Sequence, residues 1–470
     1  MYKRLQFSIL SFLLFSINLY SQNVTISGNA PTYAGDSLFF YTYSDLITYK
    51  EKKICECKVS QNGKFLCKFD VDKTKYIFAP LGIYKVILFV EPDSTYEIGL
   101  PDKQEKSIAD KLNPFFEQSE YYAGIINKTP ADLNFLIRDF DYMYEDYLKN
   151  NFYNIYHKSY SKNIDSLTLS IDSLFAKYEN KYFVNYKKYR FAFLRFLSYQ
   201  RDVKYVTKYY FSNQPVLYDN IAYMDLFNQL YQNYFSDYIN TKEGERLFSD
   251  IAYAKSPSFI KKTLDNNLAF ANDNNFKDLV ILKGLFDAFS TNDFPSSSLF
   301  YTLDSLKILT NIPENKNIAN NIKENVTQLR NGFNAPKFEL YNSDSVLTNL
   351  SDYKGKYVYL NFITTLSFTC KQDLELLKKL NEEKKDDRLV ILSISIDDNF
   401  ADCVKLFKKN GYDWDLLHFE NQSDIIKKYK VKTTPMYYLI NTKGKLSMCP
   451  AYSPREHFEY YFSKLIKSGN

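Results

Sequence analysis

Residues 361–370 read NFITTLSFTC and join two different kinds of sequence pattern. The apolar run 357–362 is typical of a short buried strand, and a helical pattern begins near Cys370. At such a helix start, backbone N–H groups and the helix dipole both stabilise a thiolate. Cys370 is therefore a candidate reactive thiol. One turn earlier, where a redox pair would place its attacking cysteine, the chain carries Ser367.

Length and composition predict a folded protein with several cores. The chain has 470 residues, which is too long for one core and predicts roughly two to four domains. Hydrophobic residues make up 45% of it, so sizeable cores can form and the composition is not that of a disordered chain. The 60 basic and 55 acidic residues are interleaved and give a net charge of +5, which argues against a nucleic-acid partner.

Residues 1–21 have the layout of a secretory signal peptide. Lys3 and Arg4 precede the mostly apolar run 7–19, and Ser21 then precedes a polar stretch, so we expect cleavage after Ser21. An uncleaved anchor helix is the alternative, although the run is short for a full span. No other run of about 18 apolar residues exists, so no stable membrane span is expected after cleavage. We expect an exported protein in the periplasm or cell envelope of a Gram-negative bacterium.

Cysteine and histidine usage gives no sign of a metal or cofactor site. The six cysteines form an N-terminal and a C-terminal group of three: Cys55, Cys57, Cys67, Cys370, Cys403 and Cys449. They are too few for a disulfide scaffold, and no spacing resembles a zinc ribbon. The three histidines, His157, His418 and His457, lie far apart in the sequence. We therefore expect no bound metal or cofactor.

Residues 22–104 carry the signals of a small β-sandwich, with short apolar runs separated by turn residues. Asn62-Gly63 marks a hairpin turn. If its loop has three residues with Gly63 left-handed, Cys57 faces Cys67 on the neighbouring strand, and a disulfide between them is possible in an oxidising compartment. Because a one-residue register change separates this pair, buried free thiols remain the alternative.

Residues 105–330 change to a helical period. Apolar residues recur at helical spacing over 133–148 and again over 164–178, and polar breaks occur at 212–215 and 295–298. No constant repeat period is present, so the pattern predicts an all-α domain and not a regular solenoid. Its many aromatic residues are read as core and amphipathic surface, with a peptide-contacting surface as the alternative.

Residues 331–470 carry a set of landmarks in a definite order. They are Gly332, Ala335-Pro336, Phe338, the stretch 350–356, Asn361-Phe362, the apolar strand 389–397, Thr434-Pro435 and the turn 441–445. This order resembles the thioredoxin superfamily. The closest branch is that of the exported thiol–disulfide interchange proteins of the TlpA/ResA type, adjoining the alkyl hydroperoxide reductase and thiol-specific antioxidant group.

The resemblance implies a C-terminal α/β thioredoxin-like fold and a peptide-binding surface. In that family the peptide bond before the second landmark proline is cis and lies beside the redox pair, which here implies a cis bond between Thr434 and Pro435. The exposed backbone of Thr434 would pair with an extended peptide by β-augmentation. The implied partner is a polypeptide, or a protein thiol or disulfide client. The oligomeric state is not indicated.

The redox motif itself departs from the family pattern. An exposed attacking cysteine, two residues and a resolving cysteine are expected, and Ser367-Phe368-Thr369-Cys370 keeps only the second thiol. A serine hydroxyl is a poor nucleophile without an adjacent base. The first hypothesis is therefore a peptide- or protein-binding, at most weakly redox-active, thioredoxin-fold protein.

Two other hypotheses remain open. Ser-x-x-Cys also resembles the peroxiredoxin motif, so Cys370 alone could support a thiol-dependent oxidoreductase or peroxidase. Cys403 and Cys449 are candidate resolving partners, and buried thiols that act as small hydrophobic residues are the alternative for both. In the third hypothesis the whole chain is a structural component of an envelope assembly that uses the aromatic helical region.

Overall fold

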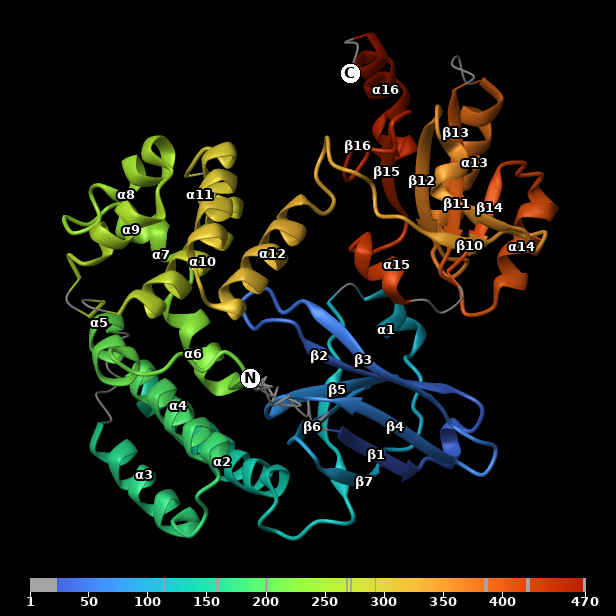
Figure 1. Cartoon of the computed structure of the whole chain (residues 1–470). Helices are drawn as coiled ribbons and strands as arrows, with labels where there is room; N and C mark the ends of the chain where they lie inside the picture. Colours follow the sequence, from blue (N-terminus) through green and yellow to red (C-terminus); the bar gives the residue numbers. More distant parts are fainter. Residues whose placement is uncertain are drawn as a thin grey trace, which may run out of the picture.

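The computed structural model describes residues 23–113, 115–157, 161–198, 202–267, 269–270, 273–291, 293–383, 388–419 and 423–467. The predicted signal peptide, residues 1–21, lies outside them. A β-sheet unit, a helical region and a C-terminal α/β domain follow one another along the chain (Figure 1). No helix within the described ranges is both long enough and apolar enough to cross a bilayer.

Two sheets pack around a common core in the N-terminal unit. The first has the order β4 (Lys64–Asp70), β1 (Asn23–Asn29), β7 (Thr95–Gly99) and β9 (Gly124–Ile125). The second has the order β3 (Glu51–Lys58), β2 (Ser37–Tyr43), β5 (Lys75–Leu81), β6 (Tyr84–Val90) and β8 (Ser119–Tyr122). Inward-facing residues of both sheets, such as Ile26, Phe40 and Tyr96, form this core. A short 3-10 turn (η1, Pro31–Tyr33) and the short helix α1 (Ile108–Leu112) accompany the sheets.

Both sheets continue past residue 104, where the sequence predicted the end of the β-domain. Strand β8 runs parallel to β6, and β9 pairs antiparallel with β7, so the β-sheet unit extends to Ile125. These two strands are four and two residues long and follow α1. Segments this short carry too little alternation to be recognised in the sequence.

The disulfide bond of the β-sheet unit differs from the predicted one. It joins Cys55, and not Cys57, to Cys67, with 6.2 Å between the two Cα atoms. The predicted three-residue loop is present, since Ser60 N donates to Lys64 O and Gly63 is left-handed. Beyond the loop, however, β3 pairs with β2 and β4 pairs with β1. Because the two strands join different sheets, the hairpin register does not fix which cysteines meet.

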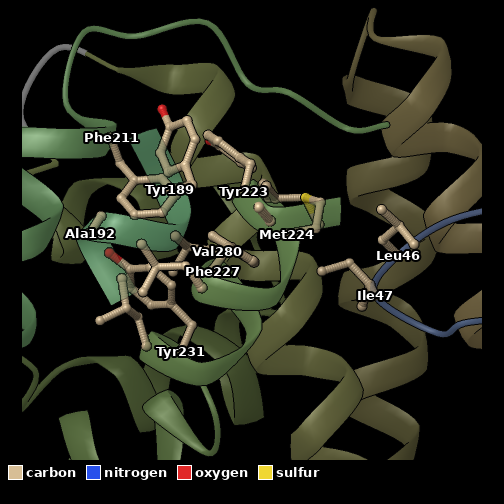
Figure 2. Close-up of a cluster of buried hydrophobic side chains, with 14 of the residues drawn as sticks. Leu46, Ile47, Tyr189, Ala192, Phe211, Tyr223, Met224, Phe227, Tyr231 and Val280 are labelled. Carbon is tan, nitrogen blue, oxygen red and sulfur yellow. The ribbon is translucent and has the colours of Figure 1, made fainter. Parts of the chain in front are cut away.

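The helical region begins at residue 133. Its longer helices are α2 (Leu133–His157), α3 (Ser161–Phe175), α4 (Lys181–Ser198), α6 (Ile221–Leu230), α9 (Pro257–Leu264), α10 (Asn274–Thr291), α11 (Ser296–Leu309) and α12 (Pro313–Thr327). Shorter turns are α5 (Val203–Val206), α7 (Tyr234–Tyr238), α8 (Leu247–Ser249) and the π-helical η2 (Thr207–Phe211) and η3 (Asp250–Ala254). Buried aromatic rings fill their shared core, among them Tyr189, Tyr223 and Tyr231 (Figure 2).

The second β-sheet is shared by two cores. On β5, Ile77 faces the core between the sheets while its neighbour Phe78 packs into the core of the helical region. The loop after β2 adds Leu46 and Ile47 to that helical core (Figure 2). The β-sheet unit and the helices are therefore joined by a continuous apolar layer.

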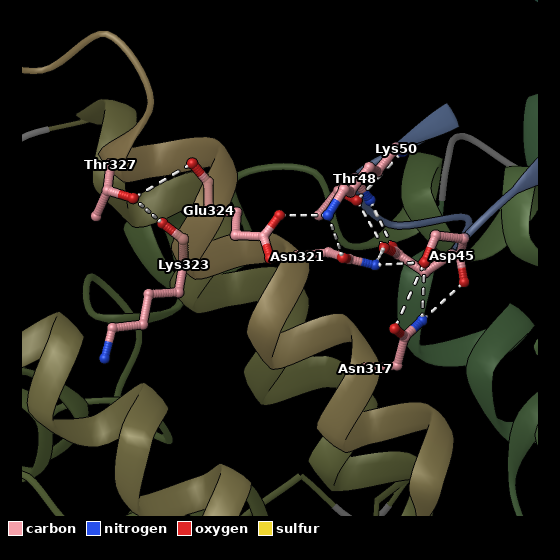
Figure 3. Close-up of polar contacts among 9 residues, drawn as sticks. Asp45, Thr48, Lys50, Asn317, Asn321, Lys323, Glu324 and Thr327 are labelled. Atoms are coloured by element: carbon pink, nitrogen blue, oxygen red, sulfur yellow. Dashed lines mark hydrogen bonds and ion pairs between the residues drawn. The ribbon is translucent and has the colours of Figure 1, made fainter. Parts of the chain in front are cut away.

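Polar contacts hold the same loop against α12 (Figure 3). The Asp45 carboxylate accepts hydrogen bonds from the Thr48 amide at 2.7 Å and from Asn321 Nδ2 at 2.8 Å. Lys50 donates to Asn321 Oδ1 at 3.1 Å and forms an ion pair with Glu324. Because Asp45 is buried, these partners satisfy a carboxylate that would otherwise lose its hydration.

The C-terminal domain has a five-stranded sheet in the order β14 (Asp415–His418), β13 (Leu389–Ser395), β12 (Tyr357–Ile363), β15 (Met436–Ile440) and β16 (Leu446–Met448). Strands β12, β13 and β14 are parallel, whereas β15 runs antiparallel to β12. All seven residues of β12 are buried, which explains why all but Asn361 are aliphatic or aromatic.

Helices cover both faces of this sheet. Side chains of α13 (Phe368–Glu383), α14 (Phe400–Asn410) and α16 (Phe458–Lys467) form one core, and α15 (Ser423–Lys428) contributes to the other. The hairpin β10 (Glu339–Tyr341) and β11 (Leu347–Asn349) and the 3-10 turns η4 (Leu350–Tyr353) and η5 (Pro454–Glu456) complete the domain. Helix α14 ends at Gly411, which takes the left-handed conformation that glycine allows at a helix end.

Mainly polar contacts connect the C-terminal domain to the rest of the chain. Lys427 at the end of α15 pairs with Glu51 on β3, and Lys111 on α1 pairs with Asp398 beyond β13. Gln328 Nε2, just after α12, donates to Lys428 O at 2.7 Å. Exposed ion pairs of this kind contribute little stability, so this junction is weaker than the apolar layer between the β-sheet unit and the helices.

Candidate functional site

Ser367 and Cys370 lie at the junction between the buried strand β12 and helix α13. The turn 364–367 connects the strand to the helix. Cys370 N donates a hydrogen bond to Ser367 Oγ at 3.3 Å. Ser367 thus caps the first turn of the helix, a role in which a serine oxygen satisfies a backbone amide that has no partner inside the helix. The serine is half-buried, whereas Cys370 behind it is only 1% exposed.

Burial opposes ionisation of Cys370. It raises the pKa of the Cys370 thiol above its usual value, and hydrogen bonds from Thr364, Ser367 and Thr434 offset this only in part. The favourable field at the helix start is therefore outweighed by loss of hydration. A thiol in this state is a weak nucleophile at neutral pH, because the thiolate is the reactive form.

The loop before β15 lies against the same helix start. The Thr434–Pro435 peptide bond is cis, and Ser367 Oγ donates to Thr434 O at 3.5 Å. The Thr434 side chain also contacts the Cys370 thiol. Next to this loop, Leu366 is 44% exposed and Phe368 is 73% exposed. An apolar surface therefore surrounds Ser367.

A buried acid lies one turn further along α13. Asp373 accepts a hydrogen bond from Tyr437 Oη at 2.9 Å and forms an ion pair with Arg455 of η5. Arg455 Nη2 also donates to Thr369 O at 3.0 Å. The sequence analysis identified neither Arg455 nor Tyr437. Arg455 has no local signal, because 82 residues separate it from Asp373 in the chain.

Asp397 fixes the turn that carries Ser367. Its carboxylate accepts hydrogen bonds from Thr364 Oγ1 at 2.7 Å, Thr365 N at 2.9 Å and Ser395 Oγ at 3.0 Å. The Asp397 backbone oxygen contacts His418 Nε2 at 2.8 Å. The carboxyl ends of β12, β13 and β14 meet here, so residues far apart in sequence share one edge of the sheet. The Asp397 carboxylate therefore has a structural role, which is to hold the turn 364–367 in place.

Comparisons with known proteins concern this C-terminal part of the chain. Residues 332–448 match the model of the AhpC/TSA family. The thiol-disulfide oxidoreductase ResA of Bacillus subtilis (strain 168) is 25% identical over 147 residues, which are 31% of this chain and 80% of ResA. ResA of Bacillus thuringiensis is 29% identical over 136 residues, or 28% of this chain and 78% of that protein.

These similarities support a thioredoxin-superfamily domain of the ResA/TlpA-like branch in the C-terminal part of the chain. Among solved structures, the thioredoxin domain of a thiol-disulfide oxidoreductase from Bacteroides vulgatus aligns with 22% identity and a TM-score of 0.26, covering 28% of this chain and 96% of that one. StoA from Bacillus subtilis aligns with 17% identity and a TM-score of 0.24, covering 27% of this chain and 96% of StoA.

The other two cysteines of the thioredoxin-like domain, Cys403 and Cys449, lie on opposite faces of its sheet. Cys403 on α14 is fully buried in the core that also contains Cys370, and burial raises the pKa of its thiol to about 12. Cys449 packs with the core of the opposite sheet face. Neither forms a disulfide with Cys370. Cys403 is thus brought into the same core as Cys370, and Cys449 is not.

Proposed function

We propose that the protein is an exported thioredoxin-like protein that binds polypeptide beside Ser367, Thr434 and Pro435, with at most weak redox activity. The observation that carries this proposal is the cis bond at Pro435 next to exposed Leu366 and Phe368, with Cys370 buried behind them. The exposed apolar side chains support binding there, and the burial of the Cys370 thiol argues against chemistry.

Backbone pairing is the mode of recognition that we propose. In the described part of the chain, the Thr434 amide makes no backbone hydrogen bond, since β15 begins two residues later. An extended peptide that lies along residues 433–435 could use this amide as an added strand does. Leu366 and Phe368 would contact its apolar side chains, which predicts a preference for unfolded segments over polar, folded surfaces.

The alternative is an oxidoreductase or peroxidase that uses Cys370 alone. Disulfide exchange needs a thiolate to attack and a second thiol to release the mixed disulfide. Here Ser367 occupies the first position of the motif, and burial holds the Cys370 thiol in its neutral form. These two features favour binding over turnover, although the ResA relatives are named as thiol-disulfide oxidoreductases.

A binding experiment tests the first proposal. The probe is reduced, carboxymethylated α-lactalbumin, a permanently unfolded chain without free thiols, and the readout is fluorescence anisotropy with the mature protein. We expect Phe368→Ser to weaken binding at least tenfold, about 1.4 kcal/mol. Tyr301→Ser is the matched control, because Tyr301 is an exposed aromatic residue on the distant helix α11. Equal loss in both variants would contradict the proposal.

A thiol-reactivity experiment separates binding from catalysis. The rate of Cys370 alkylation is measured from pH 6 to pH 10 by peptide mapping, with Cys370→Ser as the control. We expect slow labelling at neutral pH that accelerates only above about pH 8.5, the usual thiol pKa. Rapid oxidation of Cys370 by hydrogen peroxide at pH 7 would instead support the peroxidase.

Export is the remaining part of the proposal. It rests on the pattern of residues 1–21 and on the envelope location suggested by the ResA relatives. Those relatives come from Bacillus and therefore lend no support to a Gram-negative periplasm in particular. Sequencing the N-terminus of the mature protein tests it, and Gln22 is the expected first residue.

A further inference from the structure

Three cysteine side chains share one core in the β-sheet unit, outside the thioredoxin-like domain. Cys55 and Cys57 lie two residues apart on β3, so their side chains point to the same face of the strand. Cys67 lies on β4 and is bonded to Cys55. Cys57 is a free thiol, 8% exposed, in the same core as Cys67. A free thiol therefore accompanies a disulfide inside one small cluster.

Cys57 and Cys67 lie on the two strands that flank one tight loop, and both line the same core. The loop between β3 and β4 is closed by the hydrogen bond from Ser60 N to Lys64 O at 2.9 Å. Cys57 and Cys67 each lie three residues beyond this closing pair, on strands that then pair with different neighbours. The observed bond instead runs to Cys55, two residues away, across a Cα–Cα distance of 6.2 Å. Disulfides form at Cα–Cα distances of about 4.4–6.8 Å, a range that a directly opposite pair also meets.

A β-bulge beside Cys55 accounts for the bond that is observed. The register of β2 and β3 shifts between Phe40 and Tyr41, so Phe40 faces Cys55, Tyr41 faces Lys53, and Ile54 is the extra residue. Bulges bend a strand and turn its neighbouring side chains. Cys55, next to this bulge, is bonded to Cys67, and Cys57 lies two residues nearer the loop in the same core as Cys67. The Cys67 sulfur atom therefore has two candidate partners, Cys55 and Cys57.

We propose that this cluster is an internal thiol–disulfide exchange site, in which the bond moves between Cys55–Cys67 and Cys57–Cys67. The Cys57 thiol gives its proton to solvent, and its sulfur attacks Cys67 Sγ. The Sγ–Sγ bond between Cys67 and Cys55 breaks, and Cys55 leaves as a thiolate that takes up a proton. One disulfide forms as one is lost, so the step needs no external oxidant or reductant.

The exchange changes which thiol meets solvent. Cys55 is half-buried on β3, the edge strand of its sheet, whereas Cys57 points into the core. Burial, with a smaller contribution from Glu56, raises the pKa of Cys57 to about 11, so its attack on Cys67 is slow at neutral pH and becomes faster as pH rises. After exchange, the free thiol is Cys55, on an edge that a partner disulfide can reach. This thiol chemistry is separate from the proposed polypeptide binding at Pro435.

Two variants of the full mature protein test the exchange site. Cys55→Ser and Cys57→Ser are each equilibrated with a mixture of reduced and oxidised glutathione, acidified, alkylated and mapped by mass spectrometry under non-reducing conditions. We expect Cys55→Ser to form the Cys57–Cys67 disulfide as its main bond and Cys57→Ser to keep Cys55–Cys67. A Cys55→Ser protein that has the wild-type circular dichroism spectrum but alkylates at both Cys57 and Cys67 would overturn the proposal.

A trapping measurement on the unmodified protein covers the case in which Cys55→Ser does not fold. Native protein is held in excess N-ethylmaleimide at pH 8.5, and the labelled cysteine is identified over time. We expect label on Cys55 together with a new Cys57–Cys67 disulfide, although Cys57 is the free thiol at the start. Label on Cys57 with Cys55–Cys67 intact, or unchanged labelling of Cys55 in Cys57→Ser, would overturn the proposal.

Discussion

The Arg455 side chain forms an ion pair with the buried carboxylate of Asp373 and also binds Thr369 O, so it holds the first two turns of α13. Arg455 and Asp373 lie 82 residues apart in the chain. Tyr437, two residues after Pro435, completes the set by donating to the same carboxylate. The helix that carries Cys370 is thereby tied to the cis-proline loop and to the C-terminal segment.

Removal of the arginine should destabilise the thioredoxin-like domain. Arg455→Ala leaves Asp373 buried with one neutral donor, and we expect the free energy of unfolding to fall by about 2 kcal/mol, less than for a fully buried pair because Arg455 is partly exposed. Urea denaturation measures the change. In an Asp373→Asn background the same substitution should cost much less, as expected for directly coupled residues. Equal costs in the two backgrounds would show that the ion pair is not the cause.

Restoring the missing cysteine should create a disulfide. Ser367 Oγ lies 3.3 Å from Cys370 N at the start of one helix, so a cysteine there would place its sulfur near the Cys370 thiol. We expect Ser367→Cys to lose both thiols on oxidation, as measured by thiol titration and mass spectrometry. Phe368→Cys is the matched control, because that exposed side chain points away from the core. A Ser367→Cys protein that keeps two free thiols would refute this placement of the motif.

The loop after β2 should contribute strongly to stability. Ile47 is buried in the helical core, and Ile47→Ala should lower the free energy of unfolding by about 3 kcal/mol through lost burial and a cavity. Leu66→Ala serves as the control, because Leu66 is exposed on β4 and its loss should change stability by less than about 0.5 kcal/mol. Similar effects of the two substitutions in thermal unfolding would contradict the shared core.

Stability should fall at alkaline pH. Burial raises the pKa of Cys403 to about 12, whereas a thiol in the unfolded chain titrates near about 8.5. The folded state holds this proton more tightly, so the stability that it contributes is complete below about pH 8.5 and is lost as pH rises toward 12. In this window Cys403→Ala should reduce the loss by up to about 1.4 kcal/mol per pH unit. Leu66→Ala, at an exposed side chain that does not titrate, should leave the dependence of the urea midpoint on pH unchanged.

Much of the C-terminal domain is readable in its sequence because its signals are local. The apolar runs of β12 and β13 mark buried parallel strands, and the turn and proline landmarks follow in a fixed order. The positions of Ser367 and Cys370 at the start of α13 follow from that order alone. The Arg455 contact does not, because no local pattern indicates which distant residue meets a buried acid.

In the N-terminal half, the arrangement of the sheets could not be predicted from the sequence, for a different reason. Neighbouring residues Ile77 and Phe78 are both apolar because each face of the sheet meets a core, so the usual alternation of apolar and polar residues is absent from β5. Local sequence patterns also could not predict that Cys67 bonds to Cys55. It depends on the bulge at Ile54 and on the separation of β3 and β4 into different sheets, which are tertiary features.

The shared sheet has a consequence for how this chain can be divided. A fragment that ends near residue 104 would leave the aromatic face formed by Tyr41, Tyr76 and Phe78 uncovered, and such a surface promotes aggregation. Recombination within residues 23–330 would carry the same penalty, whereas the junction near residue 330 relies mostly on exposed polar contacts. We therefore expect the β-sheet unit and the helices to be inherited together, with the thioredoxin-like domain as the exchangeable module.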